Sequence, residues 1–240
     1  MSKVYACSDL HGMYQLWKQI ENYLQDDDKL IFLGDAADRG TDGIQIMVEL
    51  LADPRITYLK GNHEEMMIDV GFEILEGINY SVPLWMQNGG KQTFEDFLKF
   101  PEQYQLFLLS KLKALQEVSV YKNTQGQIIH LSHAGGMIRD IMSNNIIHLD
   151  FLWDRAHFYE NFEPDYDENL YIVHGHTPTQ ILNQRLTGTY SDNEICVYCD
   201  GHKIDIDTGC FASKQIALLD LDTLEPIYFS LEEETNGISR

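Results

Sequence analysis

The strongest constraint on the fold is the alternation of short apolar runs with amphipathic segments near the start of the chain. Apolar runs at residues 4–7, 30–33 and 56–59 have the length of buried strands, whereas residues 13–24 and 42–51 place apolar side chains at helical spacing. Strands and helices that alternate in this order form a parallel sheet with right-handed crossovers. The beginning of the chain therefore predicts a β-α-β-α-β unit.

The rest of the chain divides into a helical part and a strand-rich part. Residues 65–117 have helical stretches and no clear strand, so we expect a helical insertion in which packing alone explains most residues. Residues 118–121 and 127–131 predict a hairpin. Further strands are predicted at residues 170–173, 195–198, 203–206, 215–221 and 226–231. We therefore expect one domain over residues 1–240, with its insertion at about 65–117 and a frayed acidic tail from residue 232.

The charge of the chain limits the partners that it can bind. The net charge is −21, and the 17 Lys and Arg residues are scattered without a basic patch. Such a surface repels nucleic-acid backbones and anionic lipids. The apolar runs are too short to span a bilayer, and the start of the chain lacks the pattern of a signal peptide. We therefore expect a cytoplasmic protein that binds neither nucleic acid nor membrane.

The four cysteines suit a reduced intracellular protein. Cys196 and Cys199 stand three residues apart with His202 close behind, which would suit a structural zinc ion. A second ligand pair at convincing spacing is missing, and the stretch is rich in predicted strand. We therefore interpret these cysteines, together with Cys7 and Cys210, as ordinary thiols.

Polar side chains follow five of the apolar runs, at the point where each run ends. They are Asp9 and His11, Asp35 and Asp38, Asn62 and His63, His133, and His174 or His176. Taken one loop at a time, helix capping or surface packing explains such residues. Because the carboxyl ends of parallel strands meet at one edge of a sheet, we expect these side chains to share one cleft.

The chemistry of this set points to metal ions. Carboxylate, imidazole and amide groups without thiolate suit manganese, iron, zinc or cobalt better than magnesium. The set exceeds what one ion needs, which favours two ions that share a carboxylate. The loop at residues 34–40 places Asp35 at the end of a strand between two glycines, with Arg39 nearby. Our hypothesis is that Asp35 bridges two ions and that Arg39 holds a phosphate over them.

The motifs taken together resemble those of the calcineurin-like metallophosphoesterases. The matching stretches are Asp9-x-His11, Gly34-Asp35-x-x-Asp38-Arg39-Gly40, Gly61-Asn62-His63-Glu64, His133-Ala134-Gly135, Gly175-His176-Thr177-Pro178 and Ile206-Asp207-Thr208-Gly209. They are most similar to the bacterial and phage form of the phosphoprotein phosphatase (PPP) branch, which includes symmetrical diadenosine tetraphosphate hydrolases. The resemblance implies a mixed α/β fold, a four-layer α/β/β/α sandwich with a helical insertion.

The resemblance also implies a ligand set for two divalent ions, with manganese as the first choice and iron, zinc, cobalt or nickel as alternatives. The first ion would take Asp9, His11 and Asp35. The second would take Asp35, Asn62, His133 and His176. Nuclease-like branches have a second histidine where this chain has Pro178, so His174 is expected to be a neighbour of the site. Ser8 and Ala37 depart from the family pattern without removing a functional group.

The remaining site residues receive roles from the same resemblance. A metal-bridging hydroxide would attack phosphorus while Arg39 and Asn62 bind the phosphate. His63 would protonate the leaving group and Asp38 would orient His63, although Asp38 could instead be a helix cap. A second phosphate-binding arginine is expected at Arg155, whose alternative is a surface salt bridge, with Arg139 as the weaker choice.

These expectations describe a metal-dependent phosphatase acting on a phosphorylated protein or a small phosphoester. Within the enzyme class the alternative is a symmetrical dinucleoside polyphosphate hydrolase, whose groove walls would lie in residues 65–117. A metal-binding scaffold without turnover is a further alternative, which the intact motifs disfavour. A nuclease is disfavoured by Pro178 and by the acidic charge.

Overall fold

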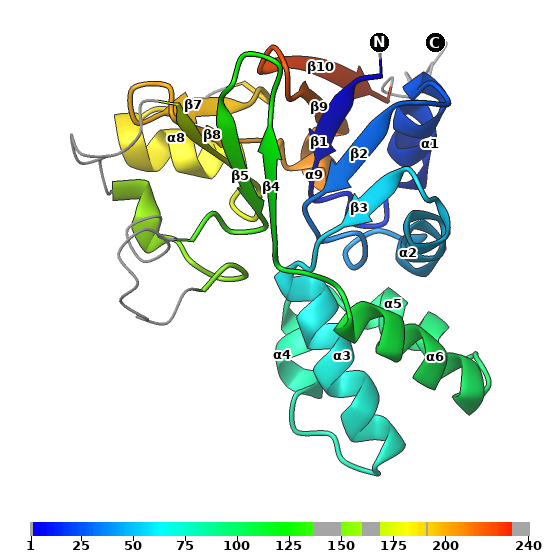
Figure 1. The fold of residues 1–240 in the computed structure, drawn as a ribbon. Helices are drawn as coiled ribbons and strands as arrows, with labels where there is room; N and C mark the ends of the chain where they lie inside the picture. Colours follow the sequence, from blue (N-terminus) through cyan, green and yellow to red (C-terminus); the bar gives the residue numbers. More distant parts are fainter. Residues whose placement is uncertain (1, 137–149, 160–168, 191, 232–240) are drawn as a thin grey trace, which may run out of the picture.

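Two five-stranded sheets face each other in the structure, a computed structural model that describes residues 2–136, 150–159, 169–190 and 192–231 (Figure 1). The first sheet has the order β10-β9-β1-β2-β3 and the second the order β4-β5-β6-β8-β7. Helices flank the pair on its outer sides (Figure 1). The expected mixed α/β class and layered sandwich are therefore confirmed.

The first sheet contains the predicted β-α-β-α-β unit. Its strands are β1 (Val4–Cys7), β2 (Lys29–Phe32), β3 (Ile56–Tyr58), β9 (Gln215–Asp220) and β10 (Glu225–Ser230). Helices α1 (Tyr14–Tyr23) and α2 (Gly43–Ala52) connect β1, β2 and β3, which run parallel in the register Tyr5–Leu30–Ile56. The sheet is completed by β9, which pairs antiparallel with β1, and by β10 at its edge.

The second sheet contains the predicted hairpin and three of the later predicted strands. Its members are β4 (Val118–Lys122), β5 (Ile128–Ser132), β6 (Leu170–His174), β7 (Cys196–Tyr198) and β8 (Lys203–Asp205). Strands β5, β6 and β8 are parallel, and β4 and β7 run antiparallel at the edges. Among the described residues, the helical elements that follow β5 are η1 (Ala156–Tyr159), α8 (Thr179–Thr187) and α9 (Cys210–Ser213). The predicted tail from residue 232 lies outside the described residues.

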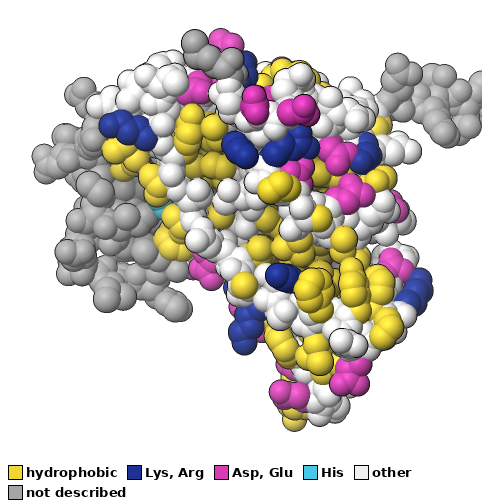
Figure 2. All heavy atoms as spheres, turned by 45° about the vertical axis from the view of Figure 1, so that its right-hand side comes forward, with side chains coloured by type: hydrophobic (Ala, Val, Ile, Leu, Met, Phe, Trp, Pro, Cys, Tyr) yellow, Lys and Arg dark blue, Asp and Glu magenta, His cyan; other side chains and the backbone are white. Residues whose placement is uncertain are grey.

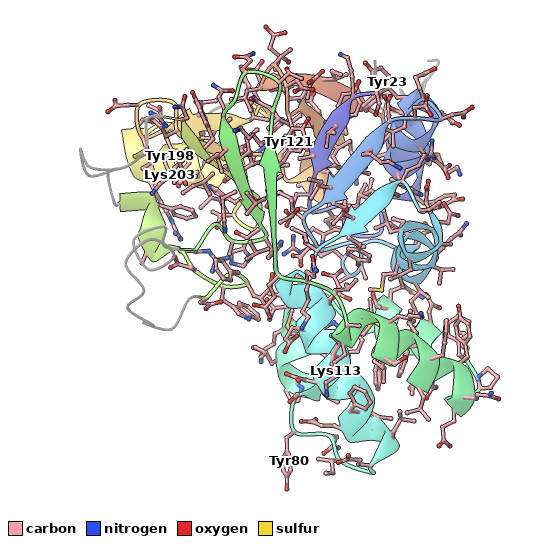
Figure 3. All side chains as sticks on the ribbon, in the orientation of Figure 1. Tyr23, Tyr80, Lys113, Tyr121, Tyr198 and Lys203 are labelled. Atoms are coloured by element: carbon pink, nitrogen blue, oxygen red, sulfur yellow. The ribbon has the colours of Figure 1, made fainter. Side chains whose placement is uncertain are left out.

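The space between the sheets is filled by alternate side chains of the inner strands. Fully buried members include Ala6, Ile31, Leu131, Val173 and Leu219. Because strand side chains alternate between faces, the remaining strand residues pack under helices on the outer sides. Tyr121, labelled in Figure 3, packs on this core from β4, and its hydroxyl donates to Asp222 Oδ1 at 3.4 Å.

Four helices between β3 and β4 form a lobe that projects from the sandwich (Figure 1). They are α3 (Asn62–Leu75), α4 (Val82–Gln87), α5 (Lys91–Phe97) and α6 (Glu102–Lys113). Figure 2 shows apolar side chains gathered over the part of the molecule where these helices lie. Among the residues that the structure describes, none of the helices has the length and apolar character that a bilayer crossing requires.

One sequence prediction in this region is wrong. The sequence places Asn62 and His63 in a loop after the apolar run at residues 56–59, but α3 begins at Asn62 and contains both residues. The cause is Glu64, whose Oε2 accepts a hydrogen bond from the Gly61 N–H at 2.8 Å and so caps the helix start. Asn62 and His63 are therefore held on the rigid first turn of a 14-residue helix.

Candidate metal centre

The candidate ligands converge where the carboxyl ends of the parallel strands of both sheets meet. Asp9, Asp35 and Asn62 follow β1, β2 and β3 of the first sheet, whereas His133 and His176 follow β5 and β6 of the second. The expectation of a single sheet edge is therefore replaced by a junction of two sheets. Two groups of residues could each hold a metal ion, because the potential ligand atoms within each group lie within 4.8 Å of one another. One group is His11, Asp35 and His63, and the other is Asp9, Asp35 and His133. Asp35 belongs to both groups.

The first half of the centre is built around the ring of His11. His11 Nε2 lies 3.7 Å from Asp9 Oδ1 and 3.7 Å from Asp35 Oδ2. His11 Nδ1 is 2.9 Å from the Ala37 carbonyl oxygen, which can only accept, so this nitrogen carries the proton. The lone pair on Nε2 therefore faces the carboxylates, where Arg39 Nη1 donates to it at 2.6 Å. Burial, with the charges of His63 and Arg39, lowers the pKa of His11 and keeps the ring neutral.

The second half gathers three polar atoms of the kinds that bind metals. His133 Nε2 lies 2.8 Å from Asn62 Oδ1 and 3.2 Å from His176 Nδ1, and the last two atoms are 3.1 Å apart. The backbone carbonyl of Leu33 accepts from His133 Nδ1 at 2.9 Å, which leaves a lone pair on Nε2. Burial and the nearby His133 and Arg155 lower the pKa of His176. Neutral rings with lone pairs turned inward are the form that a metal ion binds.

The buried charges at the centre favour a cation there. Asp35 Oδ2 lies 3.5 Å from His133 Nε2, and burial raises the pKa of Asp35, an effect that the nearby Asp9 carboxylate reinforces and His63 opposes. Asp9 Oδ1 is buried without a hydrogen-bond partner among the described residues. A buried carboxylate without compensation is costly, and this donor set is one that divalent transition metals prefer. The residues present therefore fit a pair of metal ions.

The Asp9 carboxylate is oriented from two sides. Its Oδ2 accepts hydrogen bonds from the Ser8 hydroxyl at 2.5 Å and from the backbone N–H of His176 at 3.0 Å. A Cβ at Gly175 would lie 2.3 Å from the same oxygen, so this position requires glycine. Ser8, which departs from the family pattern, thus contributes a hydrogen bond of its own.

Sequence reasoning missed the part played by Glu64. Its carboxylate is fully buried and accepts from the backbone N–H groups of Asp35 (2.8 Å), Ala36 (2.9 Å) and Gly61 (2.8 Å). The Tyr58 hydroxyl donates to it at 2.8 Å. Glu64 therefore ties the loop after β2 to the start of α3. The available signal was an acidic residue three positions after Gly61, as in a capping box.

The backbone of the site is strained. Six candidate residues have a positive backbone angle φ, which residues other than glycine rarely adopt. They are Asp9 (56°), His11 (43°), Asp35 (61°), Asp38 (71°), Arg39 (64°) and His176 (71°). Such strain persists only where surrounding contacts enforce it, and it marks functional loops.

His63 and Asp38 are in direct contact. His63 Nδ1 donates to Asp38 Oδ2 at 2.6 Å, and the His63 backbone N–H donates to Asp35 Oδ1 at 3.0 Å. Burial alone would lower the pKa of His63, but the combined effects of Asp35 and Asp38 outweigh it and raise the pKa. Nε2 lies 3.3 Å from Arg39 Nη2 and 3.7 Å from Asp35 Oδ2. Proximity alone would allow a ligand role, whereas the raised pKa favours a proton donor.

The other sequence candidates have separate surroundings. Arg155 is exposed and donates from Nε to Thr177 Oγ1 at 3.0 Å, whereas Arg139 lies outside the described residues. His174 contacts the Gly175 carbonyl oxygen through Nδ1 (3.0 Å) and the Tyr198 hydroxyl through Nε2 (2.7 Å). Figure 3 labels Tyr198 beside Lys203 on the second sheet.

The cysteines have ordinary surroundings in the structure. None of the four forms a disulfide bond in the described part of the chain. The Cys196 thiol donates to Asn183 Oδ1 at 3.3 Å, and His202 Nδ1 contacts the Leu170 carbonyl oxygen at 2.8 Å. Neither group of potential metal ligands in the described part of the chain includes a cysteine.

The fold and this centre define the chain as a two-sheet metallophosphoesterase sandwich. Residues 2–207 match the family of the calcineurin-like phosphoesterases, and the chain belongs to this family. The resemblance drawn from the motifs is therefore confirmed.

Two curated relatives illustrate the similarity. Serine/threonine-protein phosphatase 2 of Escherichia coli (strain K12) is 29% identical over 155 residues, which cover 62% of this chain and 66% of that enzyme. The matched stretch thus spans just under two thirds of that relative. The asymmetrical bis(5'-nucleosyl)-tetraphosphatase PrpE of Geobacillus sp. (strain WCH70) is 23% identical over 237 residues, covering 87% of this chain and 86% of that enzyme.

Solved structures share the fold at low sequence identity. A protein assigned provisionally as a diadenosine tetraphosphatase superposes with a TM-score of 0.61 at 14% identity, covering 97% of this chain and 95% of that one. A cold-active protein-tyrosine phosphatase of Shewanella gives a TM-score of 0.56 at 16% identity, covering 96% and 78%.

Proposed function

We propose that this protein is a phosphoester hydrolase that depends on two divalent metal ions and acts on phosphoserine or phosphothreonine in proteins. The observation that carries the proposal is the position of Asp35 between two groups of potential ligands. Manganese is the first choice of metal. The similarity to a serine/threonine-protein phosphatase supports the substrate class.

The proposed ligands divide into two sets that share Asp35. One set is Asp9, His11 and Asp35, and the other is Asp35, Asn62, His133 and His176. Bound there, divalent ions would lower the pKa of a coordinated water and offset the charge of the phosphate. The inward lone pairs of His11 and His133, fixed by carbonyl partners on Nδ1, support this assignment.

Arg39 is the proposed binding residue for the phosphate. Its guanidinium lies against the rings of His11 and His63, at 2.6 Å and 3.3 Å, so it faces the half of the centre that is built around His11. A planar fork of N–H donors matches two phosphate oxygens, a geometry that lysine lacks. Arg155 is the proposed second arginine and Asn62 the amide donor. The two arginines would place positive charge at the site of a protein whose net charge is −21.

His63 is the proposed donor of a proton to the leaving oxygen. The carboxylates of Asp35 and Asp38 raise the pKa of His63, which favours the protonated ring, and Nε2 faces the site because Nδ1 is held by Asp38. Asp38 orients the ring in this scheme. Its fully buried carboxylate accepts from a side chain 25 residues away, which supports orientation over helix capping.

A dinucleoside polyphosphate is the second candidate substrate. The relative named bis(5'-nucleosyl)-tetraphosphatase aligns over 87% of this chain, including residues beyond the metal motifs. That relative is named asymmetrical, whereas the motif resemblance suggested a symmetrical hydrolase. The groove walls that would discriminate the substrates lie in the proposed insertion at residues 65–117, within one domain of 1–240. A cytoplasmic location and the absence of nucleic-acid and membrane partners remain predictions from composition.

A substrate panel tests the proposal. The purified chain would be assayed with manganese against a phosphoserine peptide, diadenosine tetraphosphate, phenyl phosphate and single-stranded DNA, before and after chelation. We expect metal-dependent turnover that is fastest on the peptide. Preferential cleavage of the dinucleotide would select the second candidate. Metal binding without turnover of any phosphoester would instead support a scaffold.

A further inference from the structure

Helices α4 and α5 and the turn between them contact the loop after β2 at three points. Trp85, in α4, is fully buried, and its indole Nε1 donates to Asp38 Oδ2 at 2.6 Å. The Thr93 hydroxyl oxygen, in α5, accepts from the Asp38 backbone N–H at 3.1 Å. The Gly89 carbonyl oxygen accepts from the Arg39 N–H at 3.0 Å. The helical lobe therefore holds both the side chain and the backbone of this loop.

Trp85 and His63 share one oxygen of Asp38. His63 Nδ1 donates to Oδ2 at 2.6 Å, the same distance as Trp85 Nε1. Asp38 Oδ1 is buried without a hydrogen-bond partner among the described residues. A carboxylate held by the imidazole alone could rotate together with the ring. A second, rigid donor on the shared oxygen removes that freedom, because the buried indole cannot follow the rotation.

We propose that Trp85 is a positioning residue, whose N–H holds Asp38 so that Asp38 aims His63 Nε2 at the leaving oxygen. The role of His63 as proton donor rests on the proposed function. The contact chain from Trp85 through Asp38 to His63 rests on geometry alone. Residues 65–117, which we expect from the sequence to be mainly packing, would thus contribute a positioning residue to the reaction.

The close approach of the indole requires glycine beside it. A Cβ at Gly90 would lie 2.4 Å from Trp85 Cδ1 and Nε1. Gly89 has φ +95°, and a Cβ there would lie 2.9 Å from Arg39 Cγ. Phe94 covers the indole in an edge-to-face contact with centroids 5.8 Å apart. In the run Asn88-Gly89-Gly90, the two glycines therefore allow Arg39 and Trp85 to approach the backbone closely.

A pair of tryptophan substitutions tests the proposal. Trp85→Phe keeps an aromatic ring and removes the N–H donor. Trp17→Phe is the matched control, because Trp17 is equally buried and its Nε1 donates to a carboxylate, Glu49 Oε2, at 2.8 Å in another part of the fold. With manganese and phenyl phosphate, we expect Trp85→Phe to lower kcat by roughly 10- to 100-fold at unchanged KM. The loss should shrink on an activated aryl phosphate, and Trp17→Phe should keep the kcat of the unsubstituted chain.

Coupling to His63 separates positioning from a general structural effect. If Trp85 acts through His63, Trp85→Phe should cause no further loss of kcat in the His63→Ala background. If Trp85→Phe lowered kcat equally in the unsubstituted chain and in the His63→Ala background, the result would contradict the contact chain from Trp85 through Asp38 to His63.

Nuclear magnetic resonance gives a readout that does not depend on turnover. The His63 Nδ1–H donated to Asp38 should give a downfield proton resonance that His63→Ala removes. We expect Trp17→Phe to leave it unchanged and Trp85→Phe to shift or broaden it. A shifted resonance in a chain that hydrolyses no phosphoester would refute the proposed function and leave the contact chain standing. Unchanged resonance and kcat in Trp85→Phe, in an active enzyme, would overturn the positioning role.

Discussion

At the scale of single residues, one oxygen of Asp35 faces three imidazoles. Oδ2 lies 3.7 Å from His11 Nε2, 3.7 Å from His63 Nε2 and 3.5 Å from His133 Nε2. Burial raises the pKa of Asp35, so its ionised form is costly unless a positive charge lies beside it. In the proposed centre, Asp35 would contribute to ion binding in both halves.

Asp35→Asn should abolish both ion binding and turnover. The amide is neutral and cannot bridge two cations as a carboxylate does. Metal content after gel filtration, together with phosphatase activity, measures the effect. Asp42→Asn serves as the control, since Asp42 directly precedes α2 and its side chain makes no capping hydrogen bond to the helix. Two tightly bound ions in Asp35→Asn would refute the bridging role.

His63→Ala should retain the metals and slow turnover. Loss of a general acid costs roughly 10²–10⁴ in rate on a poor leaving group and less on an activated one. Steady-state kinetics with phenyl phosphate and with a nitrophenyl phosphate measure this difference. Full activity of the variant on a phosphoserine peptide would show that another group supplies the proton.

At the scale of elements, the start of α3 is joined to the loop after β2 through Glu64. One carboxylate accepts four hydrogen bonds, three of them from backbone N–H groups. This connection places Asn62 and His63, which follow β3, against Asp35, which follows β2. The helix is therefore part of the site and not only of the lobe.

Glu64→Gln should destabilise the fold. The amide group replaces one acceptor oxygen by a donor, so at least two buried N–H or O–H donors lose their partner, at about 1–3 kcal/mol each. Urea unfolding of the chelated protein should therefore show a loss of roughly 2–6 kcal/mol. The neighbouring Glu65→Gln is the control, because Glu65 is partly exposed and pairs with Lys60 at 2.9 Å. Equal stability of the two variants would argue that the hydrogen bonds of Glu64 do not stabilise the connection between α3 and the loop after β2.

At the scale of the whole molecule, stability depends on the covering of the second sheet. His130 alternates with Ile129 and Leu131 along β5, so its ring points away from the core between the sheets. The ring is buried and packs 5.8 Å from that of Phe151, and neither nitrogen has a hydrogen-bond partner within the described ranges. Burial lowers the pKa of His130 to about 4.

The fold should therefore lose stability in acid through His130. Its pKa is about 4 when folded and about 6.5 when unfolded, so the unfolded chain binds the extra proton. The loss begins as pH falls below about 6.5 and levels off below about 4, at up to roughly 3 kcal/mol. Urea unfolding of the chelated chain and of His130→Leu, compared between these pH values, isolates the contribution. A parallel pH dependence of the two proteins would contradict it.

The parallel unit of the first sheet was predictable because it depends on local patterns, and the same patterns predicted which polar residues follow its strands. A buried run such as 30–33 followed by Gly34 and Asp35 marks a strand and its loop without knowledge of distant residues. The helical start at Asn62 was missed because the decisive bond joins Glu64 to Gly61 and to the separate loop at Asp35. Loop and helix patterns overlap at such a boundary.

By itself, the sequence determined the parallel unit, the donor types and their family, since each is written in short contiguous motifs. Only the tertiary structure decided that the donors come from two sheets, that Asp35 stands between both groups, and that Trp85 reaches Asp38 across 47 positions. The physical reason is that these contacts depend on how the sheets and the helical lobe pack, and packing joins residues whose separation along the chain carries no periodic signal.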